Sequence, residues 1–224
     1  MARAPGIIGV AFGVALALII TLLGPLLLFN PAFTSILQQR HGVAEAFDVP
    51  QAEVDRVTTA VLVDLALDGS FDAAFEGREP LLDARERSHM HDVARLVRLL
   101  GLVVLVSVVV AVLSGWRLRR EPERQGMIMV IAAGSVGAAA VMLALVFAVA
   151  FEPAFLFFHQ LLFPAGTYLF EPGSNLITLF PEGFWYEAAL AAGATIVLAA
   201  LIVGIVGVLR MRAGRGPQAT DTRP

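Results

Sequence analysis

Residues 85–93 read Arg-Glu-Arg-Ser-His-Met-His-Asp-Val, and they run directly into a long apolar segment that begins near Leu96. Two of the chain's four histidines lie in this stretch, flanked by charged side chains. A histidine titrates near neutral pH, and a polar group at the mouth of a membrane helix is costly to keep there. The stretch therefore predicts both the start of a membrane span and the place of a reactive site.

The composition around this stretch is that of a membrane protein. The 224 residues are 58% apolar and 16% charged, whereas a soluble domain averages about half apolar and about a quarter charged. There is no cysteine, which excludes disulfides, thiolate metal sites and a cysteine nucleophile. All 16 basic residues are arginine, so lysine amine chemistry is excluded too. No nucleotide-binding motif is present, and we expect neither a nucleotide nor a nucleic-acid partner.

Four apolar segments are candidates to cross a bilayer core of about 30 Å. They are Gly6 to Phe29, about Leu99 to Trp116, Met127 to Phe151, and Ala188 to Leu209. Arg3 precedes the first segment, as in a signal peptide. Its 24 uncharged residues are too many for a signal peptide, however, and no small-x-small cleavage site appears before Asn30. We therefore expect an uncleaved anchor.

The arginines predict the orientation. The short link from Arg117 to Gln125 has four arginines, and the tail after Leu209 has four more. The loop from Glu152 to Glu187 has none, against four glutamates. Because basic residues favour the cytoplasmic side, we expect the link and both termini inside and the two large loops outside.

The first outer loop contains helix signals. Asp48-Val49-Pro50 followed by Glu53 indicates a helix start, and Asp68-Gly69 indicates its end. A second helix is predicted to begin near Pro80 and to continue through His89 into the second span. The loop is too small to hold a core of its own.

The second outer loop contains an apolar segment, residues 154–163, that is too short to span the membrane and is broken by Pro164 and Gly166. A second short piece, Asn175 to Phe180, is closed by Pro181-Glu182-Gly183. Such segments lie in the membrane interface or enter it as a re-entrant hairpin. This placement would put His159 at the depth of a lipid's ester carbonyls.

The expected fold class is therefore an all-α integral membrane protein. It has four transmembrane helices and two extracytoplasmic loops, which contain short helices and an interfacial or re-entrant segment. The expected divisions are residues 1–29 (cytoplasmic N terminus and first span), 30–95 (loop with the His89 motif), 96–151 (second and third spans), 152–187 (interface loop with His159), 188–209 (fourth span) and 210–224 (cytoplasmic tail).

His89 and Asp92 share a helix face at spacing i, i+3, as do Arg85 and His89 at i, i+4, while His91 points elsewhere. Asp92 is predicted to accept the N–H of His89, which would fix its tautomer and leave the other nitrogen as a base. The alternative is a solvated helix end with ordinary charge pairs. His159, among phenylalanines, is either an interfacial residue with a wet polar tip or a functional group.

Other chemistries fit the sequence poorly. His89 and His91 at i, i+2 do not converge on one metal ion from a helix, so we expect no metal and no cofactor. Ser88 adjoins His89 and cannot face it on a helix, and no G-x-S-x-G motif is present, which argues against a serine hydrolase.

Residues 86–93 resemble the E-x-x-H-M-x-D-V signature of the bacterial lipoprotein intramolecular transacylases. The second outer loop is also similar to that of the family. The similar residues are Phe158-His159, Phe163, Leu176-Ile177, Phe180-Pro181-Glu182 and Phe184. The four-span layout agrees. One departure is Asn175, where the family pattern leads us to expect an acidic residue.

The resemblance implies a bacterial cell-membrane enzyme with its site at the outer leaflet. Its substrate would be a diacylglyceryl-modified lipoprotein. The sn-2 acyl chain would move to the amino group of the terminal cysteine, which gives an N-acyl, S-monoacylglyceryl (lyso) lipoprotein. His89 and His159 correspond to the family's catalytic histidines, with Asp92, Glu86 and Arg85 in support.

The physical requirements agree with this assignment. An amide is more stable than an ester, so the shift needs no nucleotide, and the substrate itself supplies the nucleophile. Two imidazoles suffice for the proton transfers. Two alternatives remain open: a non-enzymatic membrane sensor or partner subunit, and a membrane lipid or lipoprotein ester hydrolase.

Overall fold

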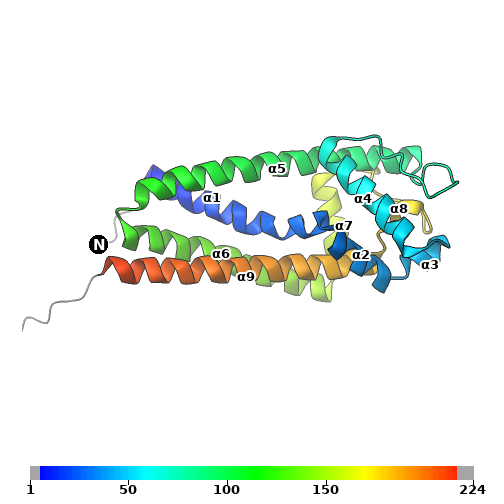
Figure 1. The fold of residues 1–224 in the computed structure, drawn as a ribbon. Helices are drawn as coiled ribbons and strands as arrows, with labels where there is room; N and C mark the ends of the chain where they lie inside the picture. The colour runs from blue at the N-terminus through cyan, green and yellow to red at the C-terminus, as the bar shows by residue number, and fades with distance from the viewer. Residues whose placement is uncertain (1–5, 216–224) are drawn as a thin grey trace, which may run out of the picture. The chain divides into compact units, whose positions relative to one another are not determined.

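The computed structural model describes residues 6–215, and this part of the chain is almost entirely helical (Figure 1). Its elements are α1 (Ile7–Leu23), the 3-10 helix η1 (Pro25–Phe29), α2 (Pro31–Arg40), α3 (Val43–Phe47), α4 (Gln51–Leu67), α5 (Ala84–Leu118), α6 (Pro122–Val149), α7 (Phe151–Leu162), α8 (Asn175–Leu179) and α9 (Glu182–Gly214). The only β pairing among these residues is an isolated bridge between Ala74 and Pro80. The predicted all-α class is confirmed. Residues 216–224 of the predicted tail lie outside the described residues.

Three of the helices, α5, α6 and α9, are long and apolar enough to cross a membrane. The first predicted span differs from the prediction. Its α-helix has 17 residues and ends at Leu23, and the remainder is the 3-10 helix η1. Pro25 explains the break, because proline has no N–H for the helical ladder and its ring disfavours continued α-helix.

The described chain forms two compact units. The bundle unit consists of residues 6–24, 103–142 and 194–215, and the histidine unit consists of residues 25–102 and 143–193. In the bundle unit, α6 and α9 approach closely at Gly126 and Gly207. A Cβ added to Gly126 would lie 2.3 Å from the Gly207 carbonyl oxygen. This agrees with the small-residue packing expected of membrane helices. Gly134, in contrast, faces open space.

The histidine unit contains the helix predicted for the first loop. Helix α4 follows Pro50 and is capped at its C-terminal end by Asp68, whose backbone is left-handed (φ 60°). Gly69 follows immediately, and a Cβ at this position would lie 1.9 Å from the Asp64 carboxylate. The missing side chain at Gly69 leaves room for the Asp64 carboxylate, which accepts a hydrogen bond from the Phe71 N–H at 2.8 Å. The Asp-Gly pair thus turns the chain back along α4.

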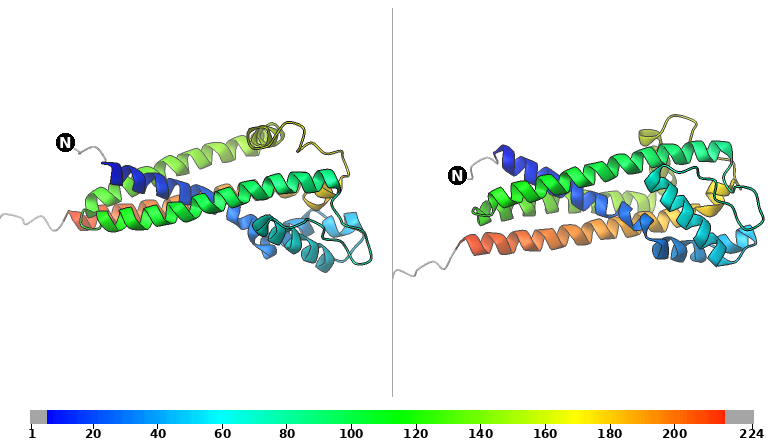
Figure 2. Two further views of the ribbon diagram at one scale, coloured as in Figure 1. Left: turned by 90° about the horizontal axis from the view of Figure 1, so that it is seen from above. Right: turned by 45° about the horizontal axis from the view of Figure 1, so that its top comes forward.

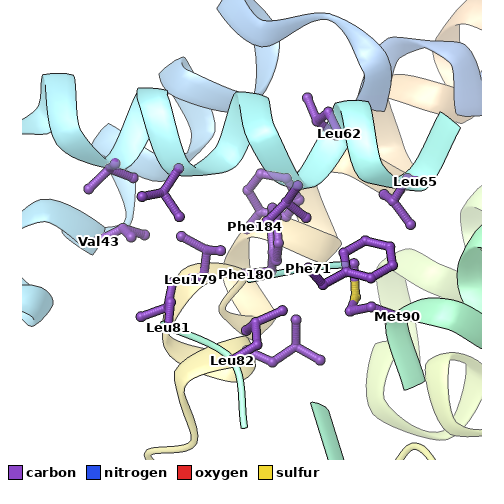
Figure 3. Close-up of a cluster of buried hydrophobic side chains, with 14 of the residues drawn as sticks. Val43, Leu62, Leu65, Phe71, Leu81, Leu82, Met90, Leu179, Phe180 and Phe184 are labelled. Atoms are coloured by element: carbon purple, nitrogen blue, oxygen red, sulfur yellow. The ribbon is translucent and has the colours of Figure 1, made fainter. Parts of the chain in front are cut away.

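The core of the histidine unit is built by both predicted loops together (Figure 3). Phe71 and Met90 lie against side chains of α4 such as Leu65, while Leu179 and Phe184 enter from the second loop. The first loop therefore has a genuine apolar core, but residues 176–188 contribute a large part of it. That shared core fixes the start of α5 against α8, which is the framework of the candidate site.

Candidate functional site

The start of α5 is fixed by a reciprocal pair of side-chain caps. The Asp83 carboxylate accepts hydrogen bonds from the backbone N–H groups of Arg85 and Glu86 at 2.7 and 2.8 Å. The Glu86 carboxyl accepts one from the Asp83 N–H at 2.8 Å. This is the capping-box arrangement, with an aspartate as the cap. It sets the register of the turn that carries His89.

The second oxygen of Glu86 joins this helix start to the second loop. It accepts a hydrogen bond from the Leu176 N–H at 2.8 Å, and Glu86 is only 1% exposed. Nearby, the Asn175 side-chain amide donates to the Leu81 carbonyl at 2.6 Å. The asparagine that departs from the expected pattern therefore suits this carbonyl, because an aspartate at the same position would have no N–H to donate.

His159 is presented by α7. Its Nδ1 lies 2.8 Å from the carbonyl oxygen of Phe155, one turn earlier. Since a carbonyl only accepts, Nδ1 must be the protonated donor, and the neutral ring then has a free lone pair on Nε2. The phenylalanine-rich sequence of α7 thus fixes both the orientation and the tautomer of this imidazole.

The structure brings the two predicted histidines together within the histidine unit. The rings of His89 and His159 are stacked, with centroids 6.2 Å apart and planes inclined at 27°. His89 is 6% exposed. Phe163 lies against both rings, at 5.0 Å from His89 and 5.6 Å from His159, and Phe170 contacts His89 at 5.5 Å. The pair is therefore enclosed by aromatic side chains of the second loop.

Arg85 fixes the loop that supplies these aromatic rings. One of its guanidinium nitrogens donates to the carbonyls of Gly166 and Leu169, at 3.2 and 2.7 Å. The guanidinium also lies over the ring of Phe170, 5.6 Å from its centroid. Figure 2 shows the loop between α7 and α8 as an irregular segment. An arginine one turn before His89 therefore holds the loop beside the histidine pair.

Burial dominates the electrostatics of the pair. His89 lies in the charged first turns of α5, before the apolar segment. Its pKa is lowered to about 4, first by burial and then by the neighbouring His159, with the charge of Asp92 acting in the opposite sense. Burial also lowers the pKa of His159, and the bond to Phe155 partly opposes the shift. Both rings are thus held in the neutral, proton-accepting form at neutral pH.

The predicted hydrogen bond between His89 and Asp92 is wrong. The Asp92 carboxylate pairs with the guanidinium of Arg95, one turn further along α5. The Nδ1 atom of His89 is buried and has no hydrogen-bond partner among the described residues. Arg95 prevails because an ion pair with an arginine is stronger than a bond from a neutral imidazole.

His91 contacts a different set of residues, as predicted. Its ring lies edge-on to Phe71 at 5.1 Å, and its Nδ1 is 3.5 Å from the Asp68 carboxylate. Arg98 also binds Asp68, at 2.7 Å. These partners anchor α5 to the end of α4.

Sequence reasoning missed several residues of the site. It did not identify Phe170 or Tyr168, whose ring lies 5.5 Å from that of His159. It also missed Asp83 as the cap of α5. The aspartate three residues before Glu86 was a readable capping signal. The aromatic contacts were not readable, because they depend on how an irregular loop folds back.

Comparison with known proteins identifies a family and a fold for this chain. The sequence model of the family described as lipoprotein intramolecular transacylase Lit matches residues 8–185. A search of curated proteins found no match. Among solved structures, the membrane-integral lipoprotein intramolecular transacylase Lit from Bacillus cereus is similar, with 20% identity and a TM-score of 0.76. The alignment covers 93% of this chain and 96% of that one.

Two substituted forms of the Bacillus cereus protein, with one histidine replaced by arginine or by alanine, are also similar in fold. Each is 18% identical, has a TM-score of 0.75 and covers 93% of this chain; the alignments cover 92% and 94% of those chains, respectively. The likeness confirms a membrane-integral, all-helical fold.

Proposed function

The chain belongs to the lipoprotein intramolecular transacylase family, and on this premise we propose that His89 and His159 catalyse an acyl shift within a diacylglyceryl-modified lipoprotein. The acyl chain leaves the sn-2 oxygen of the glyceryl group and joins the amino group of the terminal cysteine. The product is an N-acyl, S-monoacylglyceryl lipoprotein. The observation that carries this proposal is the stacking of two imidazoles in apolar surroundings, one buried and one half-buried, with ring centroids 6.2 Å apart.

The reaction needs little more than proton transfer and positioning. The amine nitrogen attacks the ester carbonyl, the C–O bond to the glyceryl oxygen breaks, and one proton moves from nitrogen to that oxygen. No atom enters or leaves. Because amine and ester belong to one bound molecule, proximity lowers the barrier, and general acid–base catalysis contributes about 10²–10⁴-fold.

The two imidazoles have different partners, which favours different roles. His159 has a free lone pair on Nε2, and the Phe155 carbonyl stabilises its protonated form. His89 has no partner for Nδ1 among residues 6–215, and its pKa of about 4 makes it a weak base. We assign removal of the amine proton to His159. His89 then delivers the proton to the glyceryl oxygen.

Arg85, Glu86 and Asp92 support the pair without taking part in proton transfer. Glu86 joins the His89 turn to Leu176, and Arg85 holds the loop through two carbonyls. Asp92 acts through its charge, which raises the pKa of His89 against the effect of burial. Their proposed role is to maintain the positions and the pKa values of the two rings.

The exposed apolar side chains of α7 suit a site that works on a lipid substrate at the membrane surface. Phe157 and Leu161 are 65% and 71% exposed, on the helix that also carries His159. A helix with such a face is stable in the membrane interface. We propose that both large loops lie outside the cell and that the site works at the outer leaflet of the bacterial cell membrane.

Mass spectrometry of lipoprotein N termini tests this function. The protein is produced in a bacterium that lacks the activity, beside the variants His89→Ala and His159→Ala. We expect an unchanged total mass, with fragments that show an acyl group on nitrogen and a free glyceryl hydroxyl, and no such shift in either variant. A gain of one acyl chain would mean transfer from a separate lipid, and a loss would mean hydrolysis. An unchanged fragment pattern would favour a non-enzymatic role.

A further inference from the structure

The ring partners of the histidine pair differ in one chemical respect. The contacting rings are Phe155, Phe158, Phe163, Tyr168 and Phe170. Tyr168 alone among these carries a hydroxyl group. Its ring is half-buried, 5.5 Å from that of His159 and tilted by 41°. No residue in the range 6–215 accepts a hydrogen bond from that hydroxyl. An isolated donor thus lies beside the proposed base.

The proposed reaction creates a need for such a donor. When the amine attacks the ester, the carbonyl π electrons move to oxygen and form an oxyanion in apolar surroundings. An unstabilised negative charge there would raise the barrier steeply, and enzymes of acyl transfer place preorganised donors at this atom. The four phenylalanines beside the pair have no donor group.

We propose that the hydroxyl of Tyr168 donates a hydrogen bond to the oxyanion of the tetrahedral intermediate. The inference rests on the proposed function and adds a catalytic residue to it. The hydroxyl keeps its own proton throughout. When the intermediate collapses, the electron pair returns to the carbonyl, the bond between the acyl carbon and the glyceryl oxygen breaks, and the amine proton goes to that oxygen through the histidines.

The loop around Tyr168 is fixed, as a preorganised donor requires. Arg85 binds the carbonyls of Gly166 and Leu169, which flank the tyrosine on either side. The Thr167 hydroxyl donates to the Pro164 carbonyl at 2.9 Å, and the Thr167 N–H donates to the same oxygen at 3.2 Å. The backbone of Tyr168 is therefore tied to α5 and to its own turn, and no hydrogen bond within residues 6–215 competes for its hydroxyl.

The chain offers a matched control, because it contains two tyrosines. Tyr186 lies on α9, with its ring edge-on to Phe151 at 5.5 Å. Tyr168→Phe and Tyr186→Phe each remove one hydroxyl and keep the ring. The purified variants are compared in detergent with a synthetic diacylglyceryl lipopeptide, by steady-state kinetics and by thermal melting.

Loss of one oxyanion donor lowers kcat by about 10²–10³-fold in comparable sites. We expect a fall of this order in Tyr168→Phe, with KM and the melting temperature unchanged, and no change in Tyr186→Phe. Incorporation of a fluorinated tyrosine at position 168, a stronger donor of the same shape, should retain or raise kcat.

Other outcomes overturn the inference. Full activity of Tyr168→Phe would mean that another group holds the oxyanion. A lowered melting temperature with activity restored by added lipid would mean that the hydroxyl is structural. Failure of the wild-type protein itself to form N-acyl product would instead overturn the proposed function. A fluorotyrosine protein with no activity, although it melts like the wild type, would exclude a donor role even if Tyr168→Phe does not fold.

Discussion

The imidazole of His89 is buried beside aromatic rings, and its Nδ1 atom has no hydrogen-bond partner among the described residues. Protonation would place a charge in these surroundings, which is why its pKa is lowered to about 4 from the ordinary 6.5. In the proposed reaction this is useful, because the ring stays neutral in the pH range in which a lipoprotein amine begins to lose its proton. Stability depends on the same shift, because at lower pH the unfolded chain binds a proton that the buried ring does not.

The pH dependence of stability should reveal this shift. Between about pH 4 and 6.5 the unfolded chain binds a proton at His89 and the folded protein does not. Stability therefore rises with pH through this window and reaches its full value above pH 6.5. We expect the melting temperature in detergent to fall as the pH is lowered below 6.5, and to fall less steeply in His89→Asn.

The comparison of His89→Asn with the wild-type protein over this pH range isolates the contribution of this one ring. If His89→Asn and the wild-type protein show parallel curves, His89 is not held in its neutral form by burial.

At this scale the sequence was informative about which histidines lie together and less so about their partners. His89 and His159 were singled out as a pair, and their rings are stacked. The partner of Asp92 was predicted wrongly, because helical spacing allowed both His89 and Arg95, and only the ion pair forms. Spacing on a helix identifies candidates, and competition in three dimensions decides between them.

At the scale of elements, Arg85 is the clearest link between α5 and the second loop. We expect Arg85→Met to lower acyl transfer at least about tenfold, because a shift of the catalytic geometry equivalent to about 1.4 kcal/mol in the barrier gives that factor. The loop would lose its bonds at Gly166 and Leu169. Rates of N-acyl product formation by purified variants provide the measurement.

Arg78 offers a close counterpart for comparison. It donates to the carbonyls of Phe47 and Asp48, and it lies over Phe75 at 5.6 Å, the same distance that separates Arg85 from Phe170. Arg78→Met should leave the rate within about twofold of wild type, since it touches neither histidine. Equal losses in the two variants would show that Arg85 acts only on general stability.

Asn175 gives a second prediction for the loop. Its amide donates to the Leu81 carbonyl, and an aspartate would turn an acceptor toward that oxygen. Asn175→Asp should therefore lower the free energy of unfolding by about 1–3 kcal/mol. Asn30 is the opposite case, since its side chain accepts from the N–H groups of Ala32 and Phe33 at the start of α2. Asn30→Asp should be neutral in thermal melting, and an equal loss in both would contradict the donor role of Asn175.

Local signals predicted the helices well and the tertiary links poorly. The turn chemistry around Pro50 and Asp68 located α4, and the apolar run identified the long helix that follows His89. The 3-10 helix η1 was not predicted, although Pro25 marks it. Contacts such as Glu86 with Leu176 join residues far apart in the sequence, and no periodicity encodes them.

At the scale of the whole molecule, the proposed orientation can be tested with single cysteines in the naturally cysteine-free chain. Asp72→Cys and Glu171→Cys lie on exposed positions of the two large loops, and Arg120→Cys lies in the exposed turn between α5 and α6. A membrane-impermeant thiol reagent should label the first two in intact cells and leave the third unlabelled until the cells are opened. The reverse pattern would place the histidine pair in the cytoplasm.

The central claim is that one lipoprotein molecule supplies both the amine and the acyl chain, and that the histidine pair moves the proton between them. A crossover experiment tests this most directly. The purified protein is given an equal mixture of two diacylglyceryl lipopeptides, which differ in peptide mass and carry ordinary or deuterated acyl chains. Our account predicts that each N-acyl product keeps the label of its own peptide, and that neither His89→Ala nor His159→Ala forms product. Products in which the label has crossed from one peptide to the other would contradict it.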